Sequence, residues 1–387
     1  MSDRHNRTKT ASVGKTASAG TIKYFDYSLL FIIIFLVGFG LVMLYSVSAY
    51  EGQSVFNDPT HYLKRQVFSV GLGFIGMFVF TYFPQKWMKK VTGLAYILSL
   101  LMCLAVFAIG KSSNGSARWL KIGPIQLQPS EISKIAVILT MALLLSKVPK
   151  QIKDFKSIIK VLIPAGIMAV AIAINNLSTG IIIAGIAIIM VFVVSPKKKE
   201  FAALGVILFG LGLAGIKMGG YRVVRIAAWL HPDQYPDKAY QTLQGMYAIG
   251  SGGLFGKGLG ASVQKLGYVP EAQNDFIFTI ICEELGLFGA ICVILLFILL
   301  IWRCMVIANS APDLYSSLIA VGVMGHIALQ VVLNICVVTN WMPNTGIILP
   351  FISYGGTSVA ILLSEMGLVL NVSRQIRFDA AHPIEIK

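Results

Sequence analysis

The chain has 387 residues, of which 56% are hydrophobic and only 13% are charged. A mean hydropathy of +0.77 excludes a water-soluble domain and predicts an all-α polytopic membrane protein. A net charge of +15 favours nucleic-acid binding in a soluble protein, but in a membrane protein basic residues set the orientation and meet anionic lipid. We therefore expect membrane lipids, and no nucleic acid, as partners. The five cysteines show no CxxC spacing and indicate packing residues.

Residues 1–25 carry basic side chains among Ser, Thr and Gly, which predicts a disordered tail. The apolar run Tyr27–Tyr50 suits a first spanning helix and is too long for a signal-peptide core. Residues 26–374 are expected to form one transmembrane domain, followed by a second tail at 375–387. Including the first, about ten spans are predicted, the others at residues 67–83, 92–110, 132–147, 161–175, 180–195, 201–219, 276–302, 317–340 and 347–372.

The distribution of Lys and Arg sets the expected orientation. If the N-terminus is inside, 20 of the 32 basic residues fall on inner segments. Because short loops rich in Lys and Arg stay in the cytoplasm, both tails are predicted to be cytoplasmic. The long loop between the seventh and eighth spans, at about residues 220–275, is then extracellular and places Asp275 on the outer face.

The outer segment at residues 114–134 mixes basic, aromatic and turn-forming residues, including Arg118 and Trp119. A helix is expected to begin near Gln128 or Ser130, because the proline between them is tolerated in a first turn. Tryptophan is common at the boundary between lipid and water, so Trp119 is interpreted as an interfacial anchor unless it has a functional role.

Glu131 and Lys134 follow in the same helix, three residues apart. This spacing puts both side chains on one helix face, where each neutralises the other at the membrane edge. A helix-end ion pair without a function is the alternative interpretation, and as an exposed pair it would contribute little. We expect a structural and electrostatic pair beside an active cavity.

Residues 240–275 form a polar loop in which glycine is unusually frequent. Glycine admits backbone angles that other residues avoid, so close approach to a ligand is expected, with Lys257 and Lys265 as nearby cations. The spacing does not fit a P-loop, which requires Ser or Thr directly after the lysine. It also does not fit the dinucleotide fingerprint, because Phe255 occupies the third glycine position.

Asp275 stands directly before an apolar run, which places one carboxylate at the boundary between water and hydrocarbon. Either Asn274 or Asp275 caps the following helix, or the carboxylate has a function. Glu283 and Glu284 lie about 12 Å deeper on that helix. Buried acids often mark an ion path, so an ion-coupled transporter or a lipid flippase is the rival hypothesis. A bond to a cation or amide of another helix also remains open.

Residues 340–358 interrupt an apolar stretch with Pro343, Gly346, Pro350 and a Gly355-Gly356 pair. Irregular backbone at membrane depth is tolerated where it lines a cavity or is buried in protein. A kinked last helix explains the same pattern. The sequence alone does not separate the two interpretations.

Two arginines, Arg222 and Arg225, begin the long outer loop. They suit either phosphate binding or snorkelling to the membrane interface. The five histidines have no metal-ligand spacing, and His326 in the ninth span is expected to pack between helices. We predict no protein metal cluster.

Several of these stretches resemble the SEDS family (shape, elongation, division and sporulation) of bacterial cell-wall polymerases. The matching runs are GSARWLKIG, QPSEISK, AIGSGGLFGKGLG, PEAQNDFIF and PNTGIILPFISYGG. The resemblance extends from Asp26 to about Arg374. The runs GLVMLYSVSAY and NNLSTG are more similar to the division branch, FtsW, than to the elongation branch, RodA, or the sporulation member.

The resemblance implies a glycosyltransferase that polymerises lipid II into glycan strands at the outer leaflet, with Asp275 as catalytic residue. Such a transfer needs a base near the attacking hydroxyl and cations for the departing diphosphate. Asp275 is the candidate base, and Lys257, Arg118 and Arg225 are candidate cations. Residues expected to support the site are Trp119, Gln128, Ser130, Glu131, Lys134, Lys265, Pro343, Thr345, Gly346, Ser353, Tyr354, Gly355 and Gly356.

The family resemblance also implies partners and a location. The substrates are lipid II and glycan linked to undecaprenyl diphosphate, and a divalent cation, Mg or Mn, is a candidate cofactor at the diphosphate. The expected protein partners are a class B penicillin-binding protein, which is a transpeptidase, and other division proteins. The expected location is the bacterial inner membrane, at the division septum.

Overall fold

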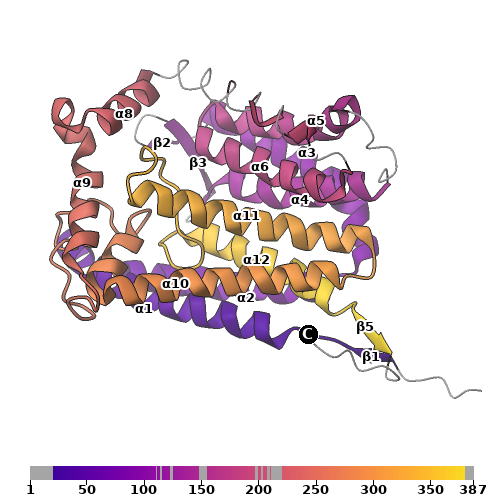
Figure 1. Ribbon diagram of the computed structural model, residues 1–387, viewed down its shortest axis with the longest axis horizontal. Coiled ribbons are helices and arrows are strands. Elements are labelled where there is room, and N and C mark those ends of the chain that lie inside the picture. Colours follow the sequence, from indigo (N-terminus) through magenta and orange to yellow (C-terminus); the bar gives the residue numbers. More distant parts are fainter. Residues whose placement is uncertain are drawn as a thin grey trace, which may run out of the picture.

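Long helices lie side by side through most of the molecule (Figure 1). The computed structural model describes residues 21–109, 111–113, 116–122, 125–147, 155–196, 199–201, 204–206, 210 and 220–379. Its helices are α1 (Tyr27–Phe56), α2 (His61–Tyr82), α3 (Gln85–Ile109), α4 (Pro129–Lys147), α5 (Phe155–Ala173), α6 (Leu177–Val194), α8 (Gly220–Leu230), α9 (Pro236–Ser251), α10 (Ile277–Asn309), α11 (Leu314–Val338) and α12 (Gly356–Ser373). A short 3-10 helix, η1 (Pro232–Gln234), joins α8 to α9.

Nine helices of the described chain are long and apolar enough to cross a membrane, namely α1 to α6 and α10 to α12. Each coincides with a predicted span, which confirms the polytopic helical fold. The remaining predicted span, 201–219, lies mostly outside the described residues. Several helices run past the predicted limits, because polar residues such as Arg303 continue a helix beyond its apolar run.

Two small sheets accompany the helices at opposite ends of the bundle. Strands β2 (Lys111–Ser113), β3 (Ser116–Ile122) and β4 (Ile125–Leu127) form an antiparallel sheet between α3 and α4. Strand β1 (Thr21–Lys23) pairs antiparallel with β5 (Arg377–Asp379). Residues 21–25 and 375–379, which were assigned to the two tails, are therefore joined to each other beside the bundle (Figure 1).

The predicted last span, 347–372, is wrong at its start, because α12 begins only at Gly356. Residues 339–355 have no helix, and the backbone is left-handed at Gly346 (φ 69°) and Phe351 (φ 64°). Proline at 343 and 350 also removes backbone donors that a helix needs. The irregular backbone is the correct interpretation of this stretch, and the kinked helix is not.

Helix α12 fills the centre of the bundle and packs against α2, α4, α10 and α11. Small residues let α2 approach it closely. Gly73 of α2 faces Ala360 and Leu363, and Gly367 of α12 faces the backbone of Met77. Close contact through small residues is the usual way that helices associate in membranes, where lipid competes equally for apolar surface.

Helix α10 is interrupted by Gly286, whose backbone is left-handed (φ 68°). At this break the loop after α9 lies against the helix: the Lys257 and Gly258 amides donate to the carbonyls of Glu283 and Glu284, both at 2.9 Å. A Cβ on Gly256 would collide with the Glu284 carbonyl. The glycines expected to approach a ligand instead approach the backbone of α10.

We predict that Gly256→Ala lowers the melting temperature of the purified protein much more than Gly260→Ala does. Both glycines are left-handed (φ 77° and 84°), so both variants carry a backbone cost of about 1–2 kcal/mol. Only the Gly256 variant also collides with α10, which adds about 1–3 kcal/mol. Equal losses would show that the loop does not pack on α10 as described.

Candidate active site

Asp275 ends the loop that leads into α10. Its carbonyl accepts a 2.8 Å hydrogen bond from the side-chain amide of Asn334 on α11, and the same amide donates to the Ile347 carbonyl at 2.7 Å. A Cβ placed on Gly346 would lie 3.9 Å from Oδ2 of Asp275. Asn334 thus holds Asp275 against the irregular segment 339–355.

The capping interpretation of this region is wrong. The N-cap residue of α10 is Phe276, and no side chain caps the helix. Asn274 donates from Nδ2 to Oε2 of Glu271 at 3.0 Å instead. The Asp275 side chain is buried and contributes to the wall of a cavity. Its carboxyl group therefore has no structural task at the helix end.

The environment of Asp275 makes it a better base than an ordinary carboxylate. Burial raises its pKa to about 6, and the negative charge of Glu271 adds to the rise. The Asp275 backbone N–H and the charge of Arg225 act in the opposite direction. A pKa closer to neutrality strengthens the group as a proton acceptor while leaving it ionised at pH 7.

A cavity of about 1250 Å³ lies beside Asp275. It is larger than the roughly 300–1,000 Å³ usual for small-molecule pockets, so it has room for a large substrate. Its walls come from α2, α4, α6, α8, α9 and α11, the loop before α10 and residues 344–358. Charged side chains of both signs line it, namely Lys64, Arg65, Glu131, Lys134, Arg225, Glu271 and Asp275.

The structure brings most of the predicted site residues to this cavity. Those that line it are Trp119, Gln128, Glu131, Lys134, Arg225, Asp275, Thr345, Gly346, Tyr354, Gly355 and Gly356. Ser130 lines a separate cavity of about 30 Å³. Pro343 and Ser353 belong to the irregular segment, where Ser353 Oγ accepts from the Leu349 amide at 2.8 Å. The side chain of Arg118 lies outside the described part of the chain.

Glu131 and Lys134 form the predicted ion pair, with 2.9 Å between Oε1 and Nζ. Both side chains are almost fully buried, so the pair is not a surface contact. Ser358 of α12 donates to Glu131 Oε2 at 2.7 Å, and Lys134 donates to Gln330 of α11 at 3.4 Å. The pair therefore joins three helices on the cavity wall.

His326 is more than a packing residue. Its Nε2 lies 2.8 Å from Oε1 of Gln330, and its Nδ1 lies 2.6 Å from Oε2 of Glu365 on α12. Gln330 also donates to the Ile348 carbonyl at 3.1 Å. A buried polar chain thus runs from Lys134 through Gln330 to His326 and Glu365, behind the cavity wall.

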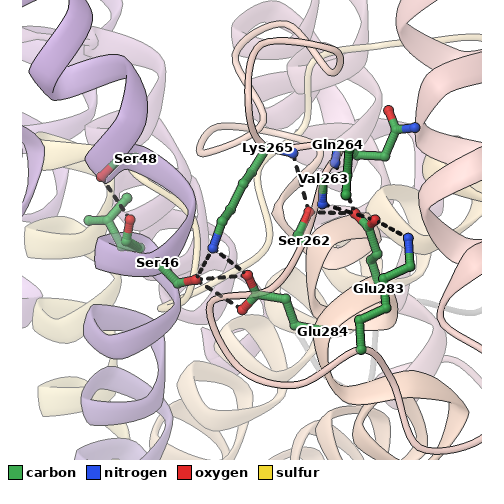
Figure 2. A network of polar contacts seen from close by, with 10 residues as sticks. Ser46, Ser48, Ser262, Val263, Gln264, Lys265, Glu283 and Glu284 are labelled. Atoms are coloured by element: carbon green, nitrogen blue, oxygen red, sulfur yellow. Dashed lines mark hydrogen bonds and ion pairs between the residues drawn. The ribbon is translucent and has the colours of Figure 1, made fainter.

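Lys257 and Lys265 do not line the cavity of the candidate site. Lys257 pairs with Glu283 at 2.7 Å, and Lys265 pairs with Glu284 at 2.7 Å. Figure 2 shows that Ser46 of α1 also donates to Glu284, and that Ser262 and the Val263 and Gln264 amides converge on Glu283. Both glutamates thus have partners from the loop and from α1, which favours the structural interpretation of these acids.

Sequence reasoning missed several residues of the site. Lys64 and Arg65 on α2 have the appearance of ordinary interfacial basic residues, yet they line the cavity. Glu51 near the end of α1 accepts from Tyr62 at 2.7 Å and from Gln273 at 2.9 Å, and so supports the approach to Asp275. The sequence feature that could have identified these residues is their position at the end of an apolar run, where a polar side chain needs a hydrogen-bond or ionic partner.

We predict that Lys134→Met destabilises the protein strongly, because it leaves the Glu131 carboxylate buried without its cation. Breaking a buried pair costs about 3–5 kcal/mol. The control is Lys64→Met, which breaks the exposed 2.9 Å pair with Asp58 and should cost at most about 1 kcal/mol. Thermal unfolding of both variants in nanodiscs measures the difference. Similar melting temperatures for the two would contradict the buried pair.

Comparison with known proteins gives matches along almost the whole chain. The profile of a family described as Cell cycle protein, which takes in FtsW, RodA and SpoVE, matches residues 27–378. Stage V sporulation protein E of Bacillus subtilis (strain 168) is 41% identical over 365 residues, which is 91% of this chain and 98% of that protein. A protein of Geobacter sp. (strain M18) named probable peptidoglycan glycosyltransferase FtsW is 35% identical over 361 residues, 92% of this chain and 98% of that one.

Solved structures share the fold. A chain of a peptidoglycan synthase complex, described for its coordination of polymerization and crosslinking, is 26% identical with a TM-score of 0.72, and the match covers 90% of this chain and 98% of that one. The rod shape determining protein RodA of Thermus thermophilus is 26% identical with a TM-score of 0.66, covering 91% and 97%. With a matching profile over nearly all of its length and relatives above 30% identity, the chain belongs to the FtsW/RodA/SpoVE family, the SEDS proteins.

Proposed function

We propose that this protein is a peptidoglycan glycosyltransferase that polymerises lipid II, with Asp275 as its general base. The observation that carries the proposal is a buried carboxyl group with a pKa of about 6 on the wall of a large cavity that also presents cations. The names of the FtsW relatives support the reaction class. These relatives are 34–35% identical to this chain over most of its length, which supports assigning the same reaction class to it.

In the proposed reaction the 4-hydroxyl of the acceptor sugar attacks C1 of the donor sugar. A new C1–O bond forms, the bond from C1 to the diphosphate oxygen breaks, and its electron pair leaves with the diphosphate. Asp275 accepts the proton of the attacking hydroxyl as that oxygen becomes bonded to carbon. Burial serves this step, because a desolvated carboxylate takes the proton more readily than a hydrated one.

The departing diphosphate needs positive charge on the cavity wall. Arg225 lines the cavity and opposes the rise in the pKa of Asp275, so it lies close enough to act on the same substrate. Arg65 lines the cavity too and forms no ion pair with any described residue. Arginine matches diphosphate oxygens with paired N–H donors. We assign the diphosphate to these two residues in place of Lys257.

A polyprenyl chain must stay in the bilayer while its head group reacts. Phe68 and Leu72 of α2 line the cavity, and both side chains are exposed. Exposed apolar side chains on the wall of a cavity suit a lipid-linked substrate. In this proposal the head group enters beside α2 and the tail remains in the surrounding lipid.

A divalent cation at the diphosphate is part of the proposal. No group of three His, Cys, Asp or Glu side chains that would hold a metal is found in the described part of the chain. Mg²⁺ usually needs only one or two protein carboxylates together with substrate phosphates and water, and Glu271 is available beside Asp275. When bound, such an ion supplies charge that neutralises the leaving diphosphate.

We propose the membrane orientation from the distribution of Lys and Arg, and the protein partners from the family. We propose that both termini are cytoplasmic and that Asp275 faces the outer leaflet of the bacterial inner membrane, because most basic residues then lie inside. The partner we propose is a class B penicillin-binding protein, supported by the similar chain in a complex that couples polymerization to crosslinking. Division proteins at the septum complete the proposed setting.

We predict that Asp275→Asn abolishes polymer formation from purified lipid II, with a loss of roughly a hundredfold or more, because an amide is a far weaker base at neutral pH. The fold should survive, since Asn334 binds the backbone carbonyl of residue 275 and not its side chain. Gel analysis of the glycan product measures the activity, and thermal unfolding checks the fold.

The matched control is Asp237→Asn, which makes the same change at an exposed position in the first turn of α9, away from the cavity. It should polymerise at the parental rate. Near-normal polymer from Asp275→Asn would remove the residue from the mechanism and would require another proton acceptor.

We further predict that activity falls as the pH drops below about 6, because the base is active only when deprotonated and its pKa is about 6. Glu271→Gln removes a negative charge that raises this pKa, so the acidic limb of the pH–rate profile should move to lower pH. Asp237→Asn should leave the limb in place. A limb at the same pH in both variants would show that Glu271 does not act on Asp275.

A further inference from the structure

In the loop after α9, apolar side chains face outward and a charged side chain faces inward, the opposite of an ordinary surface loop. Phe255 is 82% exposed, and Leu254, Leu259, Val263 and Leu266 are exposed as well. The charged Lys265 is only 9% exposed, because it points inward to Glu284 and Ser46 (Figure 2). The Lys257 side chain is 35% exposed, but its Nζ also turns to a buried carboxylate, that of Glu283. Charged groups turned inward and hydrocarbon turned outward form the arrangement that a segment takes when lipid surrounds it.

Part of the backbone of the same loop is hydrogen-bonded within the protein. In water exposed amides need no protein partner, but in lipid each unpaired amide costs several kcal/mol. Internal acceptors hold eight of the fifteen amides of residues 253–267. The bonds are from Gly256 to Gly252 O, Lys257 to Glu283 O, Gly258 to Glu284 O, Ala261 to Gly258 O, Val263 and Gln264 to the Glu283 carboxylate, Lys265 to Ser262 Oγ and Leu266 to Val263 O.

The depth of the loop can be estimated from two helices. At the opposite end of the bundle Arg303 pairs with Asp26, the N-cap of α1, at 2.5 Å. Nineteen residues separate Arg303 from Glu284 on α10, and nineteen separate Tyr27 from Ser46 on α1. At a helical rise of about 1.5 Å the unbroken span on α1 measures about 29 Å, close to the ~30 Å thickness of the hydrocarbon core. The α10 span, which contains the break at Gly286, is joined to it at both ends by the Arg303–Asp26 and Ser46–Glu284 contacts. The Ser46, Glu284 and Lys265 contacts thus lie at its far boundary.

From these observations we infer that residues 252–267 form a lipid-embedded loop, with Phe255 and Leu259 inserted among the acyl chains of the leaflet next to Asp275. The occupant of this apolar surface is the bilayer itself. A protein partner is disfavoured because the exposed side chains of Leu254, Phe255 and Leu259 are pure hydrocarbon, whereas protein interfaces carry polar contacts at their edge. The inference does not depend on the proposed reaction.

Site-directed spin labelling tests the inference without any activity assay. Phe255→Cys and Leu259→Cys, in a background without the five native cysteines, carry a nitroxide in vesicles of phosphatidylethanolamine and phosphatidylglycerol. Collisions with oxygen, which concentrates in lipid, are compared with collisions with a water-soluble nickel chelate. The control positions are Asp237 on α9, exposed beside the outer loop, and Ile97 at the midpoint of α3, exposed on the lipid-facing surface.

The expected result is an oxygen-to-nickel ratio at positions 255 and 259 severalfold above that at 237 and approaching that at 97. A ratio equal to that at 237 would place the loop in water and overturn the inference. Low collision rates with both reagents would also overturn it, because they would show a protein surface, such as a second copy of the chain, against the loop. Melting temperatures close to that of the parent confirm that labelled variants are folded.

Discussion

One side-chain amide, that of Asn334, joins the two irregular segments from which the site is built. It donates to the carbonyl of Asp275 and to that of Ile347, two groups that have no helical partner. Buried carbonyls of this kind need a donor, and a helix that carries an amide at the right level supplies both bonds at once. Together with the 2.8 Å bond from the Tyr354 amide to the Gln273 carbonyl, Asn334 fixes the loop before α10 relative to the segment before α12.

The same requirement explains the remaining buried polar groups. Glu131, Glu283, Glu284 and Glu365 each lie in a transmembrane helix, and each accepts from a Lys, Ser or His of another element or turn. Lipid supplies no hydrogen-bond donor or cation for these carboxylates, so each is stable in the membrane only where another segment provides a partner. The polar contacts therefore fix the positions of the helices that surround the cavity, while apolar contacts fill the space between them.

Hydropathy was enough to locate the spans, because a run of apolar residues has a length that the bilayer imposes. The sequence also singles out Asp275 as a candidate, since a lone acid before an apolar run is rare. The spacing of Glu131 and Lys134 predicted their ion pair. Contacts between distant segments could not be predicted from the sequence. Ser358 reaches Glu131 across 227 residues, and local spacing carries no information about such a partner. The start of α12 was misplaced because the segment before it is as apolar as a helix but is held by Asn334 and Gln330.

The central position of α12 has a consequence for biosynthesis. Helix α12 is the last spanning helix of the described chain to leave the ribosome, yet it supplies Ser358 to Glu131 and Glu365 to His326, and Ser373 accepts from the Asp26 amide at the start of α1. Until it inserts, α4 and α11 hold polar groups in the membrane that lack these partners. The face of α2 that packs against α12 is also uncovered. The nascent protein thus carries intramembrane polar groups that gain their hydrogen-bond partners only when synthesis reaches the C-terminal helix.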